Sequence, residues 1–214
     1  MKALFFDFDG VLFDLEPVHY QAWQLTLKKL GHKELGLSLK DVIGISDWEL
    51  GETFIKKFHL KLTLNELLDK KRQEYQNLLP SHPFDTAKLQ TLLTHLHSKY
   101  TLLIVSSSHT EEILQLLEQH NLHSFFTHII GGNSVKLHKP HPEPYLLALK
   151  KTNLAPSQAI AIEDSDAGLK SATSAGLKVI WVNTYNLPPK PLPTCTTLSE
   201  LPHLLSISLE IFFI

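Results

Sequence analysis

The stretch Leu4-Phe-Phe-Asp-Phe-Asp-Gly-Val-Leu-Phe-Asp14 decides how the whole chain is interpreted. Its apolar start, Leu4 to Phe6, is typical of a strand buried on both faces, and Gly10 then ends the run. Asp7 and Asp9 follow, although carboxylates are costly to bury without a partner. In extended backbone both would project to the same side, and a cation between them would relieve their repulsion. The alternative is an ordinary Asx turn that ends the strand.

Composition excludes several classes of function. The 214 residues include 20 Lys and Arg against 22 Asp and Glu, so there is no basic excess to attract nucleic acid or an anionic membrane. Hydrophobic residues make up 43% of the chain, which is enough for a full core. The 13 histidines are scattered without metal-ligand spacing, and most of them are interpreted as surface residues. We expect a monomer that acts on a small molecule and has no nucleic-acid or membrane partner.

The cysteine count and the ends of the chain indicate the compartment. Cys195 is the only cysteine, which excludes an internal disulfide and fits a reducing cytosol. Asp7 and Asp9 interrupt the N-terminal apolar stretch, so no signal peptide is expected, and no run reaches transmembrane length. We therefore expect a cytoplasmic protein. The apolar last residues, 210–214, are interpreted as a final edge strand or a covered tail rather than a partner site.

Between Pro17 and Pro80 the pattern is helical, without a strand run. Helical segments are predicted at residues 18–30, 39–42, 50–58 and 64–79. Pro80 and Pro83 then interrupt the periodicity. We predict an all-helical domain over residues 15–83, inserted into an α/β domain that is formed by residues 1–14 and 84–214.

Beyond residue 84, helices alternate with short buried strands. Further strands are predicted at residues 102–105, 126–130, 159–162 and 179–182. Helices are predicted at residues 86–99, 110–120, 143–151 and 167–175, and a proline-rich loop at residues 187–193. This alternation is typical of an α/β fold with a doubly wound parallel sheet and right-handed crossovers.

Polar residues directly follow three of the predicted strands. Asp7 and Asp9 follow the first strand, Ser106 the second, and Glu163 with Asp164 the fourth. In open parallel sheets, ligands bind beyond the carboxyl ends of the strands. We therefore expect these side chains to meet at one edge of the sheet.

Each of these residues also has an ordinary structural explanation. Ser106 could cap a helix, and Glu163 and Asp164 could favour the N-terminus of the helix that follows them. Lys139, on a loop between two strands, could be a solvated lysine. Their coincidence at one edge of the sheet favours a functional site.

The residue types at this edge favour magnesium and phosphoryl transfer. They are carboxylates, a hydroxyl and a lysine, with no cysteine and with His109 as the only histidine at a strand end. Hard oxygen ligands suit Mg²⁺, which keeps waters and pairs with phosphate oxygens. A carboxylate can attack phosphorus to give an aspartyl-phosphate, while Mg²⁺, the lysine, the hydroxyl and backbone N–H groups neutralise the equatorial oxygens.

Four segments, in this order and spacing, resemble the motifs of the haloacid dehalogenase superfamily. They are Asp7-Phe-Asp9-Gly-Val, the apolar strand that ends in Ser106, Lys139-Pro, and Glu163-Asp164-Ser. The resemblance covers nearly the whole chain. Lys139-Pro-x-Pro and Ile162-Glu-Asp-Ser-x-x-Gly168 resemble the subgroup with a helical cap after the first motif. That subgroup holds β-phosphoglucomutase-like and phosphoglycolate phosphatase-like enzymes, and it implies a Rossmann-like core.

The resemblance implies a role for each matching position. Asp7 would be the nucleophile and a Mg²⁺ ligand. Asp9 would be the general acid/base and would bind Mg²⁺ through its backbone carbonyl. Asp164 would also bind Mg²⁺, and Glu163 would do so directly or through water. The residues that would bind the transferring phosphoryl group are Ser106, Ser107 and Lys139.

An acid at position 9 favours phosphate esters, because it can protonate the departing alkoxide and later activate water. Dehalogenases proper and phosphonate hydrolases differ at this position, so dehalogenation is not expected. We expect a Mg²⁺-dependent phosphatase that hydrolyses a small phosphomonoester, such as a sugar phosphate, through an aspartyl-phosphate on Asp7.

The predicted helical domain also resembles the cap of this subgroup, in Asp14-x-x-x-x-His19-x-x-x-Trp23 and in Gly44-Ile-Ser46. In the mutase an arginine after that serine holds the second phosphate. Here the position is Asp47, whose negative charge would repel a bisphosphate and so favours plain hydrolysis.

Three residues of the cap are candidate substrate contacts, namely His19, Ser46 and Lys71. For Lys71 a solvated helix lysine is the simpler interpretation. For His19 and Trp23 the simpler interpretation is hinge and cap packing. We expect the cap to close over the site, with hinges near Asp14 and residues 80–83.

Two other functions compete with the phosphatase. A phosphosugar mutase of β-phosphoglucomutase type would yield isomerised product rather than free phosphate. A receiver-type phosphoacceptor domain would share the parallel sheet, the acidic strand ends, Mg²⁺, an Asp, a Ser or Thr and a Lys. Receivers are shorter and lack a helical insertion, and Asp9 would hydrolyse the acyl phosphate rather than preserve it.

Overall fold

The computed structural model describes residues 1–43, 45–84, 86–183 and 190–211. The chain packs into two compact units. We call the unit of Met1–Phe13 and Asp85–Ile214 the α/β unit, and the unit of Asp14–Phe84 the helical unit. The predicted fold class, an α/β fold with an inserted all-helical segment, is confirmed.

The α/β unit is built on a sheet of six parallel strands in the order β3-β2-β1-β4-β5-β6. The strands are β1 (Ala3–Phe6), β2 (Thr101–Val105), β3 (Phe126–Ile130), β4 (Ala159–Glu163), β5 (Lys178–Val182) and β6 (Thr194–Cys195). The first five begin and end within one residue of the predicted runs. The prediction of a doubly wound parallel sheet is therefore confirmed.

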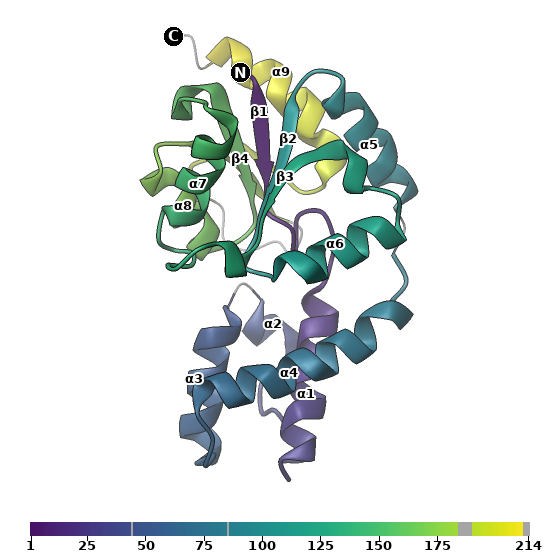
Figure 1. Cartoon of the computed structure of the whole chain (residues 1–214), viewed down its shortest axis with the longest axis vertical. Coiled ribbons are helices and arrows are strands. Elements are labelled where there is room, and N and C mark those ends of the chain that lie inside the picture. Colours follow the sequence, from purple (N-terminus) through teal and green to yellow (C-terminus); the bar gives the residue numbers. More distant parts are fainter. Residues whose placement is uncertain (44, 85, 184–189, 212–214) are drawn as a thin grey trace. The chain divides into compact units, whose positions relative to one another are not determined.

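Helices cover both faces of this sheet, which is why its central strands are apolar at every position. Both β1 and β4 are buried along their whole length. Alternate residues of β1, Ala3 and Phe5, belong to one core cluster with side chains of α7 (Glu143–Thr152) and α8 (Asp166–Ser174). In Figure 1, α7 and α8 lie on one side of the sheet and α5 (Ala87–His97) lies on the other.

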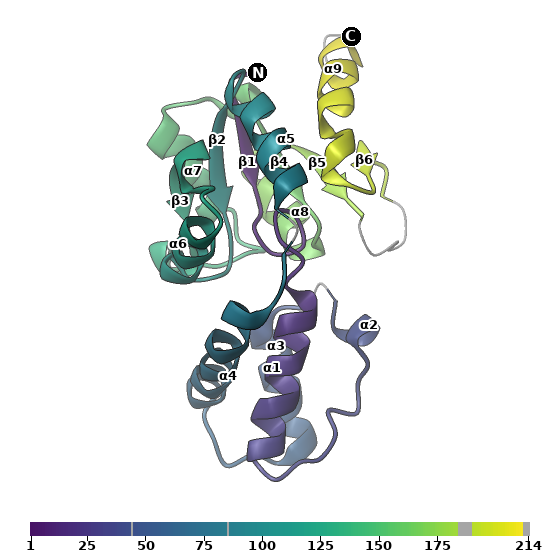
Figure 2. The ribbon, with the colours of Figure 1, turned by 90° about the vertical axis from the view of Figure 1, so that its right-hand side faces the viewer.

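The helices predicted for the α/β unit correspond to α5, α6 (Thr110–Gln119), α7 and α8, with ends that differ by at most two residues. The strand β6 and the helix α9 (Leu201–Ile211), which follow β5 in Figure 2, were not predicted as such. Of the predicted proline-rich loop, residues 187–189 lie outside the described part of the chain.

The apolar residues 210–214 were predicted to form a final edge strand or a covered tail. An edge strand is wrong for residues 210–211, which belong to α9, and residues 212–214 lie outside the described part of the chain. Short apolar runs do not distinguish helix from strand by periodicity alone, which accounts for the error. No helix in the described ranges is both long and apolar enough to cross a membrane.

The helical unit is built on α1 (Glu16–Lys29), α2 (Leu39–Val42), α3 (Asp47–Phe58) and α4 (Leu64–Leu78). Each overlaps a predicted segment. Trp23, Phe54 and Leu67 are buried together in its core, and the rings of Trp23 and Phe54 meet edge to face with centroids 5.1 Å apart. Trp23 is 1% exposed, so its interpretation as a packing residue is confirmed.

The reactivity of the single thiol, Cys195, tests whether β6 is buried against β5. Cys195 is fully buried, and burial raises the pKa of its thiol to about 11. We expect the native protein to react negligibly with an aromatic disulfide reagent at pH 8, whereas the urea-unfolded chain should react with one equivalent. Stopped-flow absorbance measures both rates. Rapid labelling of the native protein would contradict the burial of β6 against β5.

Candidate active site

The strand register brings the ends of β1, β2 and β4 together. Phe6 pairs with Ile104 on β2 and with Ile162 on β4. The N–H of Asp7 continues the ladder and donates to the carbonyl oxygen of Ile162 at 2.9 Å. The sheet grows from β1 toward β3 on one side and from β4 toward β6 on the other, so these ends lie at the switch point where open α/β sheets bind ligands.

Lys139 lies among these strand ends. Its Nζ donates to Asp7 Oδ1 at 2.9 Å, to Glu163 Oε1 at 2.6 Å and to the carbonyl oxygen of Val105 at 2.8 Å. The Lys139 side chain is 3% exposed, so the alternative of a solvated loop lysine is wrong. A buried ammonium needs such partners, because the cost of removing it from water is otherwise several kcal/mol.

Glu163 is fully buried, and two donors hold its Oε1. Its Oε1 accepts from Lys139 and also from the hydroxyl of Tyr145, at 2.5 Å. Burial and the negative charge of Glu163 raise the pKa of Tyr145 well above its ordinary value, so the phenol keeps its proton and donates it. The ammonium of Lys139 lies 5.3 Å from the centre of the Tyr145 ring. Sequence reasoning missed Tyr145, because it fits the apolar face of α7 and no motif marks it.

Three carboxylates converge beside this lysine. One oxygen each from Asp7, Glu163 and Asp164 lies within 4.8 Å of the others. Burial raises the pKa of Asp7 to about 7, despite the opposing effect of Lys139. One ammonium among three carboxylates leaves an excess of negative charge. A divalent cation with oxygen ligands would offset this excess, so the residues fit Mg²⁺.

The remaining predicted residues of the α/β unit are Asp9, in the turn after β1, and Ser106 and Ser107, directly after β2. Asp9 Oδ2 lies 3.5 Å from Ser106 Oγ and 2.5 Å from Ser108 Oγ. Ser106 is buried, whereas Ser107 is exposed. The structure therefore brings Asp9 and Ser106 together. Ser107 lies between two residues that contact Asp9, but its own side chain is exposed.

The cap candidates belong to the helical unit. Ser46 is the N-cap of α3, where its Oγ accepts from the N–H of Glu49 at 3.2 Å. Lys71 is 3% exposed, forms an ion pair with Asp47 at 2.6 Å and hydrogen-bonds to His19 Nδ1. The interpretation of Lys71 as a solvated lysine is therefore wrong. Gly44, part of the cap pattern, lies outside the described residues.

Asp47 is engaged on both of its oxygens. Besides Lys71 on Oδ2, the indole N–H of Trp23 donates to Oδ1 at 2.9 Å. Burial by itself would raise the pKa of Asp47, but Lys71 and His19 hold that pKa below its usual value. His19 also stacks on Tyr75, with centroids 4.4 Å apart. The negative charge expected at position 47 is thus present, but Lys71 compensates it. The expectation that this carboxylate alone would repel a second phosphate is corrected accordingly.

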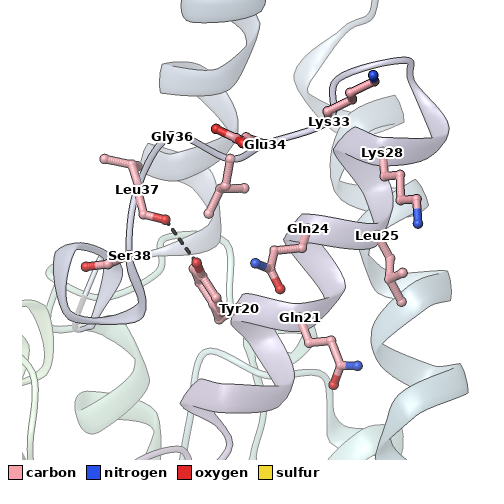
Figure 3. A pocket seen from close by; sticks show the side chains of 11 residues that line it. Tyr20, Gln21, Gln24, Leu25, Lys28, Lys33, Glu34, Gly36, Leu37 and Ser38 are labelled. Atoms are coloured by element: carbon pink, nitrogen blue, oxygen red, sulfur yellow. Dashed lines mark hydrogen bonds between the residues drawn. The ribbon is translucent and has the colours of Figure 1, made fainter.

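A separate surface pocket of about 600 Å³ lies within the helical unit (Figure 3). Gln21, Gln24 and Lys28 line it from α1, and the hydroxyl of Tyr20 donates to the carbonyl oxygen of Leu37 at 3.0 Å. None of the candidate site residues, all of which the structure describes, lines this pocket.

Gly168 in α8 is required by the close approach of Glu163. A Cβ at this position would lie 1.9 Å from Glu163 Oε2. Alanine is normally better than glycine in a helix by about 1 kcal/mol. Here we expect the opposite sign, a loss of about 1–3 kcal/mol in the free energy of unfolding for Gly168→Ala, because overpacking displaces Glu163 from Lys139.

Urea unfolding measures this loss. The matched control is Ser174→Ala at an exposed position of the same helix, which should change stability by less than about 0.5 kcal/mol. A Gly168→Ala protein as stable as the wild type would show that Glu163 does not occupy this space.

Comparisons with known proteins agree with this geometry. The family model for haloacid dehalogenase-like hydrolases matches residues 4–182. The chain is 27% identical over 191 residues to a phosphorylated carbohydrates phosphatase of Thermotoga maritima, covering 87% of each protein. It is 26% identical over 181 residues to a fructose-1-phosphate phosphatase of Escherichia coli, covering 83% of this chain and 94% of that protein.

A solved structure of a β-phosphoglucomutase from Clostridium difficile also matches. It superposes with a TM-score of 0.81 at 23% identity and covers 100% of both chains. At this level of identity the likeness shows the fold.

Proposed function

Because the chain belongs to the haloacid dehalogenase-like hydrolases, we propose that it is a Mg²⁺-dependent phosphatase that hydrolyses a small phosphomonoester through an aspartyl-phosphate on Asp7. The observation that carries this proposal is the buried Lys139, which joins Asp7 to Glu163 beside Asp164. The relatives named as phosphatases of phosphorylated carbohydrates support a sugar phosphate as the substrate.

Each residue has its own role in the proposed reaction. A carboxylate oxygen of Asp7 attacks phosphorus, and the bond between phosphorus and the ester oxygen breaks. Asp9 gives its proton to the departing alkoxide. In the second half, Asp9 takes a proton from water, whose oxygen attacks phosphorus and releases Asp7 and inorganic phosphate. Lys139 and Ser106 bind the equatorial oxygens and offset their charge throughout.

The metal would be held by residues that already face one another. Asp7 and Asp164 would bind Mg²⁺ through their carboxylates, and Asp9 through its backbone carbonyl. Glu163 already accepts from Lys139 and Tyr145, which favours contact through water over direct ligation. When bound, Mg²⁺ supplies positive charge to the transferring phosphoryl group.

Removal of the metal should therefore abolish turnover and weaken the fold. We expect phosphate release to cease in EDTA and to return with added Mg²⁺. Because the cation binds the folded chain, the melting temperature should rise with Mg²⁺ concentration. Calorimetry measures this shift without any substrate. A melting temperature independent of Mg²⁺ would contradict the assignment of the metal site.

Mutase chemistry is less favoured by the helical unit. A second phosphate would need a net positive partner, but Lys71 is already neutralised by Asp47. The balanced charge supports the proposal that the protein has no nucleic-acid or anionic-membrane partner, and the single cysteine supports a reducing, cytoplasmic compartment.

The test is a panel of sugar phosphates and other small phosphate esters, assayed with and without Mg²⁺. We expect inorganic phosphate and the free alcohol in stoichiometric amounts. Isomerised sugar phosphate without phosphate release would indicate the mutase instead. A phosphorylated protein that persists without turnover would indicate a receiver-like acceptor.

A further inference from the structure

Ser108, outside the four motifs, makes a closer hydrogen bond to Asp9 than Ser106 does. Its Oγ donates to Asp9 Oδ2 at 2.5 Å, whereas Ser106 Oγ lies 3.5 Å from the same oxygen. A serine hydroxyl carries a single proton. Ser106 therefore cannot donate to a phosphoryl oxygen and to Asp9 at the same time, but Ser108 can hold Asp9 while Ser106 turns to the substrate.

The backbone of Ser108 is fixed on both sides. Its N–H donates to Ser106 Oγ at 3.0 Å, and its carbonyl oxygen accepts from the N–H of Gly132 at 2.8 Å. A Cβ on Gly132 would lie 2.3 Å from the carbonyl oxygen of Ser107. The turn after β2 thus packs directly on the backbone after β3, which explains why glycine is needed there. Ser108 is half-buried and presented by a rigid turn rather than by a free loop.

We propose that Ser108 is a positioning residue that holds the carboxylate of Asp9 in place for proton transfer to the leaving alkoxide and from water. This inference rests on the proposed function. Without the Ser108 hydroxyl, Asp9 keeps the weaker 3.5 Å contact with Ser106, which binding of the phosphoryl group would remove. Small misplacements of a reacting group can cost about 100-fold in rate.

The dependence on the leaving group separates positioning from a general structural role. The variants are Ser108→Ala, Ser108→Thr, which keeps the hydroxyl, and Ser98→Ala, which removes a surface hydroxyl bonded to the carbonyl of His95. The probes are fructose 1-phosphate, whose alkoxide needs a proton, and p-nitrophenyl phosphate, whose phenolate leaves without one. In each case kcat/KM is measured.

For Ser108→Ala we expect kcat/KM to fall about 10- to 100-fold with fructose 1-phosphate but less than about 3-fold with p-nitrophenyl phosphate. Ser108→Thr should restore most of the loss, and Ser98→Ala should match the wild type. Equal losses on both esters, or no loss on either, would overturn the proposal.

Crystal structures of the wild type and of the two Ser108 variants provide a readout that needs no turnover. We expect the Asp9 carboxylate to contact residue 108 in the wild type and in Ser108→Thr, and to change its orientation in Ser108→Ala. An unchanged orientation in all three would overturn the positioning role. If the wild type hydrolysed neither ester, the proposed substrate class would fail, and these structures would still decide whether Ser108 positions Asp9.

Discussion

Replacement of Asp7 by asparagine is expected to lower kcat by about four orders of magnitude or more, the scale seen when a nucleophile is removed. The amide has nearly the same shape as the carboxylate but cannot attack phosphorus. Lys139 keeps its bonds to Glu163 and to the carbonyl oxygen of Val105, so the site keeps its geometry. Phosphate release under saturating substrate measures the loss.

The same variant should remain folded, which separates loss of chemistry from loss of structure. Burial raises the pKa of Asp7 from 3.8 to about 7 in the folded, metal-free protein. The folded state therefore binds this proton more tightly than the unfolded state, and the stability that this group contributes falls as pH rises from about 4 to about 7. Above pH 7 the ionised Asp7 lowers the free energy of unfolding of the metal-free protein, and an uncharged asparagine would not.

We therefore expect metal-free Asp7→Asn to be at least as stable as the wild type at pH 8, with the difference disappearing near pH 4. Urea unfolding in EDTA at both pH values measures it. A marked loss of stability at pH 8 would contradict this account of Asp7, and retained turnover would contradict its role as nucleophile.

Lys139→Met is expected to have the largest effect on stability. It leaves the buried carboxylates of Asp7 and Glu163 without their ammonium, and breaking a buried ion pair in this way costs about 3–5 kcal/mol. Activity should fall about 100- to 1000-fold, because the charge that offsets the phosphoryl oxygens is lost. Added Mg²⁺ should restore part of the stability, since it supplies a cation to the same carboxylates.

The free energy of unfolding in EDTA and in Mg²⁺ tests this directly. Lys170→Met, at an exposed position of α8, is the matched control and should behave as the wild type does. A loss below about 1 kcal/mol in EDTA would mean that the three carboxylates do not depend on Lys139 for their charge balance.

The sequence predicted the α/β sheet well because burial on both faces leaves a direct signal. The runs that form β1 and β4 are apolar at successive positions, and the carboxyl ends of parallel strands meet at one edge. That rule, applied to Asp7, Ser106 and Glu163, is enough to predict that these residues lie at one edge of the sheet.

The contacts that complete the site leave no such signal. Ser108 and Asp9 are 99 residues apart, and a hydrogen bond between two loops has no periodicity to detect. Tyr145 follows the apolar pattern of α7, and its hydroxyl matters only because Glu163 lies opposite.

The interpretation of Lys71 as a solvated lysine is wrong for a similar reason. Lys71 belongs to a helix rich in polar residues, and only the packing of the helical unit places its ammonium beside the rings of Trp23 and Tyr75. The additional helix α9 reflects the ambiguity of short apolar runs.

The central claim is that Asp7 carries the phosphoryl group while Lys139, Ser106 and Mg²⁺ surround it. Beryllium trifluoride mimics a phosphoryl group on a carboxylate, so a crystal structure of the protein with Mg²⁺ and this compound tests the claim most directly. We predict beryllium bonded to a carboxylate oxygen of Asp7, Mg²⁺ between Asp7 and Asp164, and Lys139 Nζ on a fluorine. Beryllium on a different residue, or Mg²⁺ away from these carboxylates, would contradict it.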